Sequence, residues 1–74
     1  MMDELDLHGT RHEEVSRLLE NFLYPHIQKG TSEVKIITGK SPEMKQIVHD
    51  TLKLYGMTAI EEWVNFGCLI VKMT

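Results

Sequence analysis

The 74-residue sequence predicts an α/β fold, a two-layer α+β sandwich with the element order βαβαββ. Two stretches with helical spacing of apolar residues alternate with short runs of β-branched residues, the pattern of parallel strands joined by crossover helices. Two polar segments, Leu5-Asp6-Leu7-His8-Gly9 and Thr38-Gly39-Lys40-Ser41, stand where a strand gives way to a helix. Because parallel strands end at one edge of a sheet, where such folds bind ligands, we expect these segments to share one site.

The first predicted strand runs from Glu4 to His8. Side chains alternate along a strand, so Leu5 and Leu7 point to one face, and Asp6 and His8 point to the other. The leucines are expected under the helices. The polar pair is then expected on the open face, close to the end of the strand.

The first predicted helix follows at once. Thr10-Arg11-His12-Glu13 matches a capping box, in which Thr10 would accept from a helix amide. Pro25 is expected to kink or loosen the last turn, and Lys29-Gly30 is a favourable end. The residues expected on its buried stripe are Val15, Leu18, Leu19, Phe22 and His26.

A second strand and a second helix repeat the unit. The strand is predicted from Glu33 to Thr38, with β-branched residues at its centre. Ser41 is a natural N-cap and Pro42 a natural first residue, and Gly56 is expected to end the helix. The residues expected on the apolar face of this helix are Met44, Ile47, Val48, Leu52 and Tyr55.

Two more strands complete one domain that spans residues 1–74. They are predicted at Thr58–Val64 and Cys68–Met73, joined by a tight hairpin at Asn65-Phe66-Gly67. Both crossovers should be right-handed, which places both helices on one face of a four-stranded mixed sheet.

Composition excludes several classes of protein. A net charge of −3 is unfavourable for a non-specific nucleic-acid binder, although it permits a local basic site. No apolar run approaches the roughly 20 residues of a membrane span, and acidic residues interrupt any N-terminal signal peptide. Cys68, the single cysteine, is expected to be a buried hydrophobe in a reducing compartment, so we expect a cytoplasmic protein.

The polar residues of the two segments suit chemistry on a phosphodiester. His8 stands close to a carboxylate, Asp6, and can transfer a proton near neutral pH. Gly39, Lys40 and the start of the second helix favour a phosphate oxygen, because free amides and a full positive charge converge there. Gly9 permits close approach of a ligand to the backbone.

These residues carry a resemblance to the small MutS-related (Smr) domain family. Leu5-Asp6-Leu7-His8-Gly9 matches the leading motif of that family, and Val34 to Lys40 matches its second motif, with Ser41 in place of the last glycine. The resemblance covers nearly the whole chain. It implies a fold like that of the C-terminal domain of bacterial translation initiation factor three, and endonuclease action on RNA or DNA.

By that resemblance, Asp6 and His8 take the positions tied to cleavage, and Thr38, Gly39 and Lys40 take the second-motif positions. We therefore predict an endonuclease in which His8 moves a proton and Asp6 orients it. The residues expected to bind nucleic acid are Gly9, Arg11, Thr38, Gly39, Lys40, Ser41 and Lys45.

Two alternative functions fit the same residues. One is a non-catalytic module that binds nucleic acid or the ribosome, and the other is a protein-interaction domain whose open sheet face docks a partner. Trp63 and Phe66, near the hairpin, either stack on a base or cover the sheet. No cofactor is indicated by the residues; a need for Mg²⁺, the choice between RNA and DNA, and the oligomeric state are left open.

Overall fold

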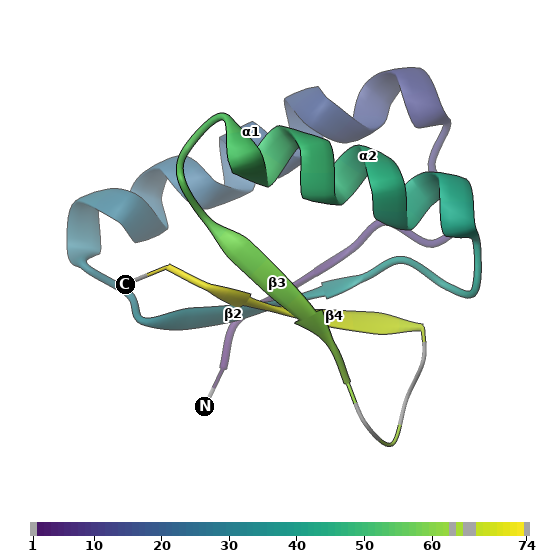
Figure 1. Cartoon of the computed structure of the whole chain (residues 1–74). Coiled ribbons are helices and arrows are strands. Elements are labelled where there is room, and N and C mark those ends of the chain that lie inside the picture. The colour runs from purple at the N-terminus through teal and green to yellow at the C-terminus, as the bar shows by residue number, and fades with distance from the viewer. Residues whose placement is uncertain (1, 63, 65–66, 74) are drawn as a thin grey trace.

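Within the described residues, four strands form one mixed sheet, and two helices pack on one face of it (Figure 1). The computed structural model describes residues 2–62, 64 and 67–73. The two-layer α+β architecture and the order βαβαββ are confirmed. In chain order the elements are β1 (Glu4–Asp6), α1 (His12–Lys29), β2 (Glu33–Ile37), α2 (Pro42–Lys53), β3 (Thr58–Glu61) and β4 (Cys68–Lys72).

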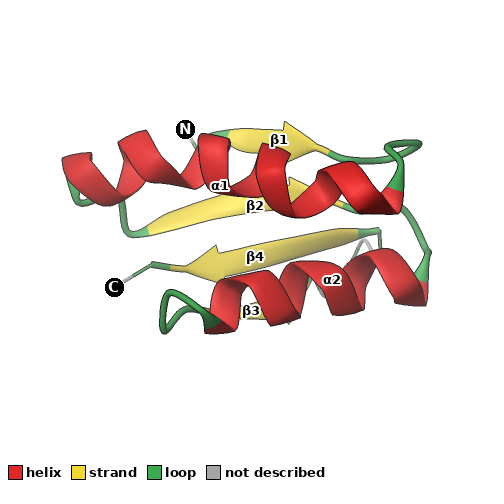
Figure 2. Cartoon of the chain, turned by 90° about the horizontal axis from the view of Figure 1, so that it is seen from above, coloured by secondary structure: helices red, strands yellow, loops and turns green. Residues whose placement is uncertain are grey.

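The strands lie in the order β1-β2-β4-β3 across the sheet. β1 and β2 are parallel, whereas β4 is antiparallel to both of its neighbours. Viewed from above, α1 lies over β1 and β2, and α2 lies over β4 and β3 (Figure 2). Because β1 and β2 point the same way, the turns that lead into α1 and α2 leave the sheet at one edge, as predicted.

The core lies between the sheet and the helices. Alternate residues of β2 and β4 are fully buried there, and the residues between them face the other side. Leu7, expected under the helices, is 0% exposed. The remaining core residues are Val15, Leu19, Leu23, Val34, Ile36, Met44, Val48, Leu52, Met57, Leu69 and Val71.

The opposite face of the sheet, called the open face below, is covered by neither helix (Figure 1). Strand register sets out its side chains in rows. Asp6, Ile37 and Cys68 form one row across β1, β2 and β4. A second row contains Glu4, Lys35, Ile70 and Ile60. The predicted placement of Asp6 on this face is confirmed.

His26 is a polar member of the buried stripe of α1, 6% exposed. Its Nδ1 lies 2.9 Å from the hydroxyl oxygen of Thr31, and its Nε2 lies 3.2 Å from a carboxylate oxygen of Asp3. The ring also contacts Phe22, with centroids 4.9 Å apart. These contacts fasten the end of α1 to the segment before β1.

The predicted capping box of α1 is wrong. The N-cap is Arg11, which makes no side-chain capping hydrogen bond. The amide of Thr10 donates to the carbonyl of Leu7 at 2.9 Å, so Thr10 belongs to the turn after β1 and lies one residue too early to cap the helix. At its other end the helix continues through Pro25 and stops at Gly30, whose φ of 73° is the left-handed conformation expected there.

α2 ends sooner than predicted. After Lys53 the chain tightens, because the amides of Leu54, Tyr55 and Gly56 donate to carbonyls three residues back, at 3.1, 2.9 and 3.1 Å. Tyr55 therefore leaves the apolar face and is 43% exposed, which corrects its predicted burial. Ser41 and Pro42 begin the helix as predicted.

The strands are also shorter than predicted at their carboxyl ends. β1 stops at Asp6 and not at His8, because the amide of His8 donates to the Asp6 side chain. β3 stops at Glu61, well before Val64. Of the predicted hairpin only Gly67 is among the described residues, and Trp63 and Phe66 lie outside them.

Candidate functional site

The two predicted segments meet at the edge of the sheet where β1 and β2 end. The amide of Leu7 continues the β1–β2 pairing by donating to the carbonyl of Ile37 at 2.7 Å. Beyond that point His8 lies against Gly39: a β-carbon built on Gly39 would come within 2.6 Å of the His8 Cδ2 atom. The first motif therefore touches the second through an imidazole ring packed on a glycine.

Asp6 shapes the turn that presents His8. Its Oδ1 accepts a hydrogen bond from the backbone amide of His8 at 2.9 Å, a local Asx-type contact that fixes the chain direction. Both side chains are exposed. The described contact therefore acts on the backbone of His8, whereas the sequence predicted an effect on its ring.

Gly9 follows in the left-handed conformation, with a φ of 82°, which explains a glycine at this position. A β-carbon built there would meet nothing within 4 Å. The backbone angle, and not close packing, is thus what the described structure requires of Gly9.

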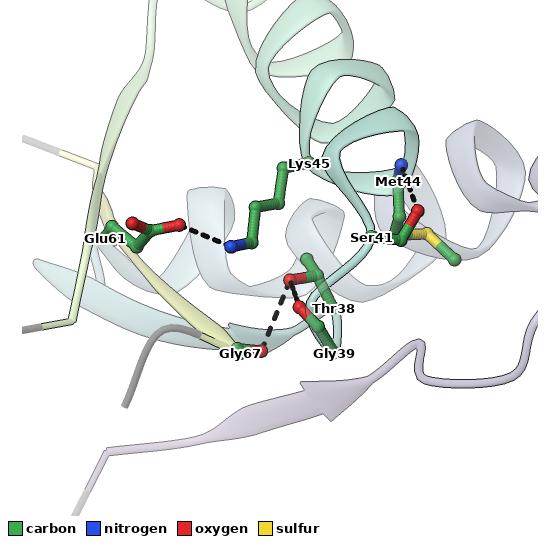
Figure 3. A network of polar contacts seen from close by, with 7 residues as sticks. All are labelled: Thr38, Gly39, Ser41, Met44, Lys45, Glu61 and Gly67. Carbon is green, nitrogen blue, oxygen red and sulfur yellow. Dashed lines mark hydrogen bonds and ion pairs between the residues drawn. The ribbon is translucent and has the colours of Figure 1, made fainter. Parts of the chain in front are cut away.

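Thr38 and Gly39 are held in place by Gly67, the residue immediately before β4 (Figure 3). Their amides donate to the Gly67 carbonyl at 2.8 and 3.0 Å. The Thr38 hydroxyl lies 2.8 Å from the carbonyl oxygen of Gly39 and 3.2 Å from that of Gly67. Since Thr38 is also 2% exposed, its position serves the turn and does not offer the hydroxyl to a ligand.

Ser41 begins α2 with a side-chain cap. Its Oγ accepts from the amide of Met44 at 3.1 Å (Figure 3), and Pro42 occupies the first turn without an amide to satisfy. The backbone amides of Lys40 and Ser41 donate to no other residue that the structure describes. These two amides and the positive end of the α2 dipole are what this turn offers to an anion.

The predicted cations differ in whether their charged groups are available to bind an anion. Lys40 is exposed and forms no ion pair within the described part of the chain. Arg11 lies 3.7 Å from Glu13, but both side chains are strongly exposed, so that pair is weak and the guanidinium stays available. Lys45 pairs with Glu61 (Figure 3) and is only 18% exposed, which commits its ammonium group.

An open pocket of about 490 Å³ joins these features. Such a volume falls within the usual range for small-ligand sites. Ile37 and Cys68 are open-face residues, so the pocket reaches from the turns onto that face. Its lining residues are His8, Ile37, Gly39, Lys40, Gly67 and Cys68.

The thiol of Cys68 is not an activated nucleophile. Burial raises its pKa above the ordinary value of 9.0, and the negative charge of Glu62 raises it further. A thiol held neutral in this way is a poor nucleophile and a poor metal ligand. Across residues 2–62, 64 and 67–73, no three His, Cys, Asp or Glu side chains are grouped so that they could hold a metal ion.

Sequence reasoning missed three pocket residues, Ile37, Cys68 and Gly67. The alternation of β2 gave a signal for Ile37, because it places that side chain on the same face as Asp6. Gly67 gave no local signal, since its role depends on a partner 29 positions away.

The sequence also predicted the absence of a membrane segment. No helix within the described ranges is long and apolar enough to cross a membrane. The cytoplasmic location and the ribosome as a partner stay predictions.

A model of one protein family matches the chain over residues 5–74, and its description is Smr domain. The match contains both polar segments and every pocket residue. The searches of curated proteins and of solved structures gave no match, so the likeness to initiation factor three stays a prediction. A match of this extent shows that the chain belongs to the Smr domain family.

Proposed function

We propose that this domain binds nucleic acid at the edge where β1 and β2 end, and cleaves a phosphodiester bond there. The contact between His8 and Gly39 carries the proposal. It brings a proton-transfer group beside a turn that offers the ammonium group of Lys40 and two amides that donate to no other described residue. General acid–base chemistry and anion binding are thus available within one pocket.

The geometry supports one role for each of these groups. A phosphate oxygen would lie against the amides of Lys40 and Ser41, with the Lys40 side chain neutralising charge that develops during cleavage. The attacking oxygen, from a 2′-hydroxyl of RNA or from water, would form a bond to phosphorus as the P–O bond to the leaving oxygen breaks. His8 would take the proton from the attacking oxygen or give one to the leaving oxygen. Asp6 would hold the backbone of His8, so its effect on the rate would be indirect.

Charge supports a local and salt-sensitive interaction. The chain carries −3 overall, so the general field repels a polyanion. Lys40 and Arg11 are the predicted site cations that remain available, whereas Lys45 is neutralised by Glu61. We expect weak binding that depends on few phosphate contacts.

The test is cleavage of labelled single-stranded RNA and DNA by the purified domain, with and without magnesium. His8→Ala should lower the cleavage rate by roughly 10²–10⁴-fold and leave affinity nearly unchanged. The matched control is His49→Ala, since His49 belongs to α2 and does not line the pocket. Full activity of the His8→Ala protein would remove His8 from the chemistry.

A second candidate is a module that binds nucleic acid without cutting it. The observation that favours it is the Asp6 contact, which engages the backbone of His8 and not its ring. Binding by the wild-type protein, with no cleavage of either polymer under any condition, would select this candidate.

A further inference from the structure

The pocket beside His8 has an apolar floor, which would contribute nothing to the binding of a phosphate. Ile37 and Cys68 are directly paired residues of β2 and β4, and their side chains point away from the helices. Phosphate groups are bound by amides and cations, which lie at the other wall, at Lys40. An apolar floor with polar groups at its margin is the usual form of a site for a flat organic group.

An ion pair borders this floor on the side of β3. Lys35 shares a face with Ile37, two residues earlier in β2, and the amide of Glu62 donates to the carbonyl of Cys68 at 3.0 Å. The Lys35 Nζ lies 3.4 Å from both carboxylate oxygens of Glu62. The two side chains therefore reach toward each other across β4, beside Cys68.

Electrostatics agrees with this placement. After burial, the two strongest influences on the pKa of Cys68 are Glu62, which raises it, and Lys35, which lowers it. Both charges thus act directly on the floor of the pocket. Their side chains are only 28% and 27% exposed, so neither is fully solvated.

One oxygen of the Glu62 carboxylate, Oε2, lacks a hydrogen-bond donor among the described residues, whereas Oε1 accepts from Lys35. Oε2 is also inaccessible to solvent. The contact with Lys35 is longer than the 2.7–2.9 Å typical of a charge-assisted bond. A buried acceptor without a donor calls for an explanation, and a ligand that brings N–H groups supplies one. The last torsion of a glutamate is soft, so the carboxylate can turn toward the floor.

We infer that Ile37, Cys68, Glu62 and Lys35 form a nucleobase subsite that selects guanine, an inference that rests on the proposed binding of the phosphate at Lys40. The Watson–Crick edge of guanine presents two adjacent N–H donors and one carbonyl oxygen. A carboxylate can accept both donors at once, and an ammonium group can donate to the carbonyl. Adenine, cytosine and uracil each present a single donor position on that edge, so each leaves one oxygen of Glu62 without a partner.

The experiment is an NMR titration of the labelled domain with the 5′-monophosphates of guanosine, adenosine, cytidine and uridine, and with inorganic phosphate. All five probes should shift the amides of Lys40 and Ser41. Guanosine monophosphate should also shift Ile37, Cys68 and Glu62, and should bind roughly tenfold more tightly than the other nucleotides.

Variants of Glu62 and of a control glutamate test whether Glu62 is the source of the preference for guanine. Glu62→Gln should remove the preference for guanine and leave the shifts at Lys40 unchanged, because the amide replaces one acceptor oxygen with an NH₂ donor, which cannot accept the second N–H group of guanine. Glu33→Gln is the matched control: Glu33 is also a glutamate of the open face that pairs with a lysine, Lys72, on β4. It should keep the preference.

The outcomes separate this inference from the proposed function. Equal affinity for all four nucleotides, with shifts at Lys40, would refute the subsite and leave the phosphate site standing. A preference for guanine without cleavage of any polymer would support the subsite and count against catalysis. Shifts nowhere in the pocket would overturn both, and a preference that survives in Glu62→Gln would refute the assignment to Glu62.

Discussion

The imidazole ring of His8 occupies the space that a β-carbon at position 39 would need, because a β-carbon built on Gly39 would come within 2.6 Å of the His8 Cδ2 atom. This contact joins two segments that are far apart in the sequence, and it fixes the distance between the His8 ring and the turn at residues 38–41. Gly39 also has a φ of 69°. The position thus requires glycine for two independent reasons, the backbone angle and the space taken by the ring.

Gly39→Ala should therefore lower the cleavage rate strongly and the free energy of unfolding only modestly. The left-handed backbone costs an alanine about 1–2 kcal/mol of unfolding free energy. In addition, the methyl group would come within 2.6 Å of Cδ2 of His8 and displace the ring. Cleavage should fall toward the level of His8→Ala, as measured alongside urea denaturation.

Gly56→Ala separates the two effects. Its φ of 68° nearly equals that of Gly39, but a β-carbon there would meet nothing within 4 Å. The variant should lose a similar amount of stability and keep its activity. Equal activity of the two variants would mean that the ring position is unimportant.

Lys40 and Lys45 should differ in their effect on binding, although both are lysines near the start of α2. Lys40→Ala should weaken binding and reduce the slope of log affinity against log salt by about 1, the loss of one phosphate contact. Lys45→Ala should leave the slope unchanged, because Glu61 already neutralises that charge. Lys53→Ala, at the far end of α2, is the control for net charge. A reduced slope in Lys45→Ala would place that lysine in the interface.

The two predicted helix caps, Ser41 and Thr10, should also differ in their contribution to the free energy of unfolding. Ser41→Ala removes the acceptor of the Met44 amide and should cost about 1 kcal/mol of unfolding free energy. Thr10→Ala should cost little, because the side chain of Thr10 caps no helix in the structure. Chemical denaturation of both variants measures the difference. A loss for Thr10→Ala equal to that for Ser41→Ala would show that the capping box forms in solution.

Stability should fall at alkaline pH in a way that depends on Cys68. Burial raises the pKa of its thiol above the ordinary 9.0, so the unfolded chain ionises first as pH rises. The stabilisation is fully present below pH 9.0 and is lost as pH rises through the folded-state pKa. The unfolding free energies of the wild type and of Cys68→Ala should be measured from neutral to alkaline pH. The difference between them should shrink as the pH rises. Parallel curves would contradict the burial of an uncharged thiol.

Local signals predicted most of the fold. Gly30 and the pair Ser41-Pro42 mark helix ends through their own backbone preferences, so they were found without knowledge of the tertiary structure. Thr10 and Tyr55 were misassigned because a turn adjacent to each helix takes over hydrogen bonds that the local pattern assigned to the helix. The strand order was not predictable from such signals, since β4 inserts between β2 and β3 through pairing alone.

In the candidate site, too, some features could be predicted from the local sequence and others could not. That the two polar segments would meet at one edge follows from two parallel strands with matched ends, and the contact of His8 with Gly39 confirms it. The commitments of Thr38 to Gly67 and of Lys45 to Glu61 could not be predicted, because those partners lie 29 and 16 positions away. The type of a residue can be read locally, but whether its polar group is free depends on such distant partners.

The carbonyl of Gly67 has a consequence for the order in which this protein becomes functional. It accepts from the amides of Thr38 and Gly39, yet Gly67 immediately precedes β4, the last strand of the sheet to leave the ribosome. During synthesis, the residues of β1, β2 and both helices therefore emerge before the turn at residues 38–41 has its anchor. A nascent or truncated chain that lacks β4 has both motifs but cannot hold them in working geometry, so the site matures only with the completed sheet.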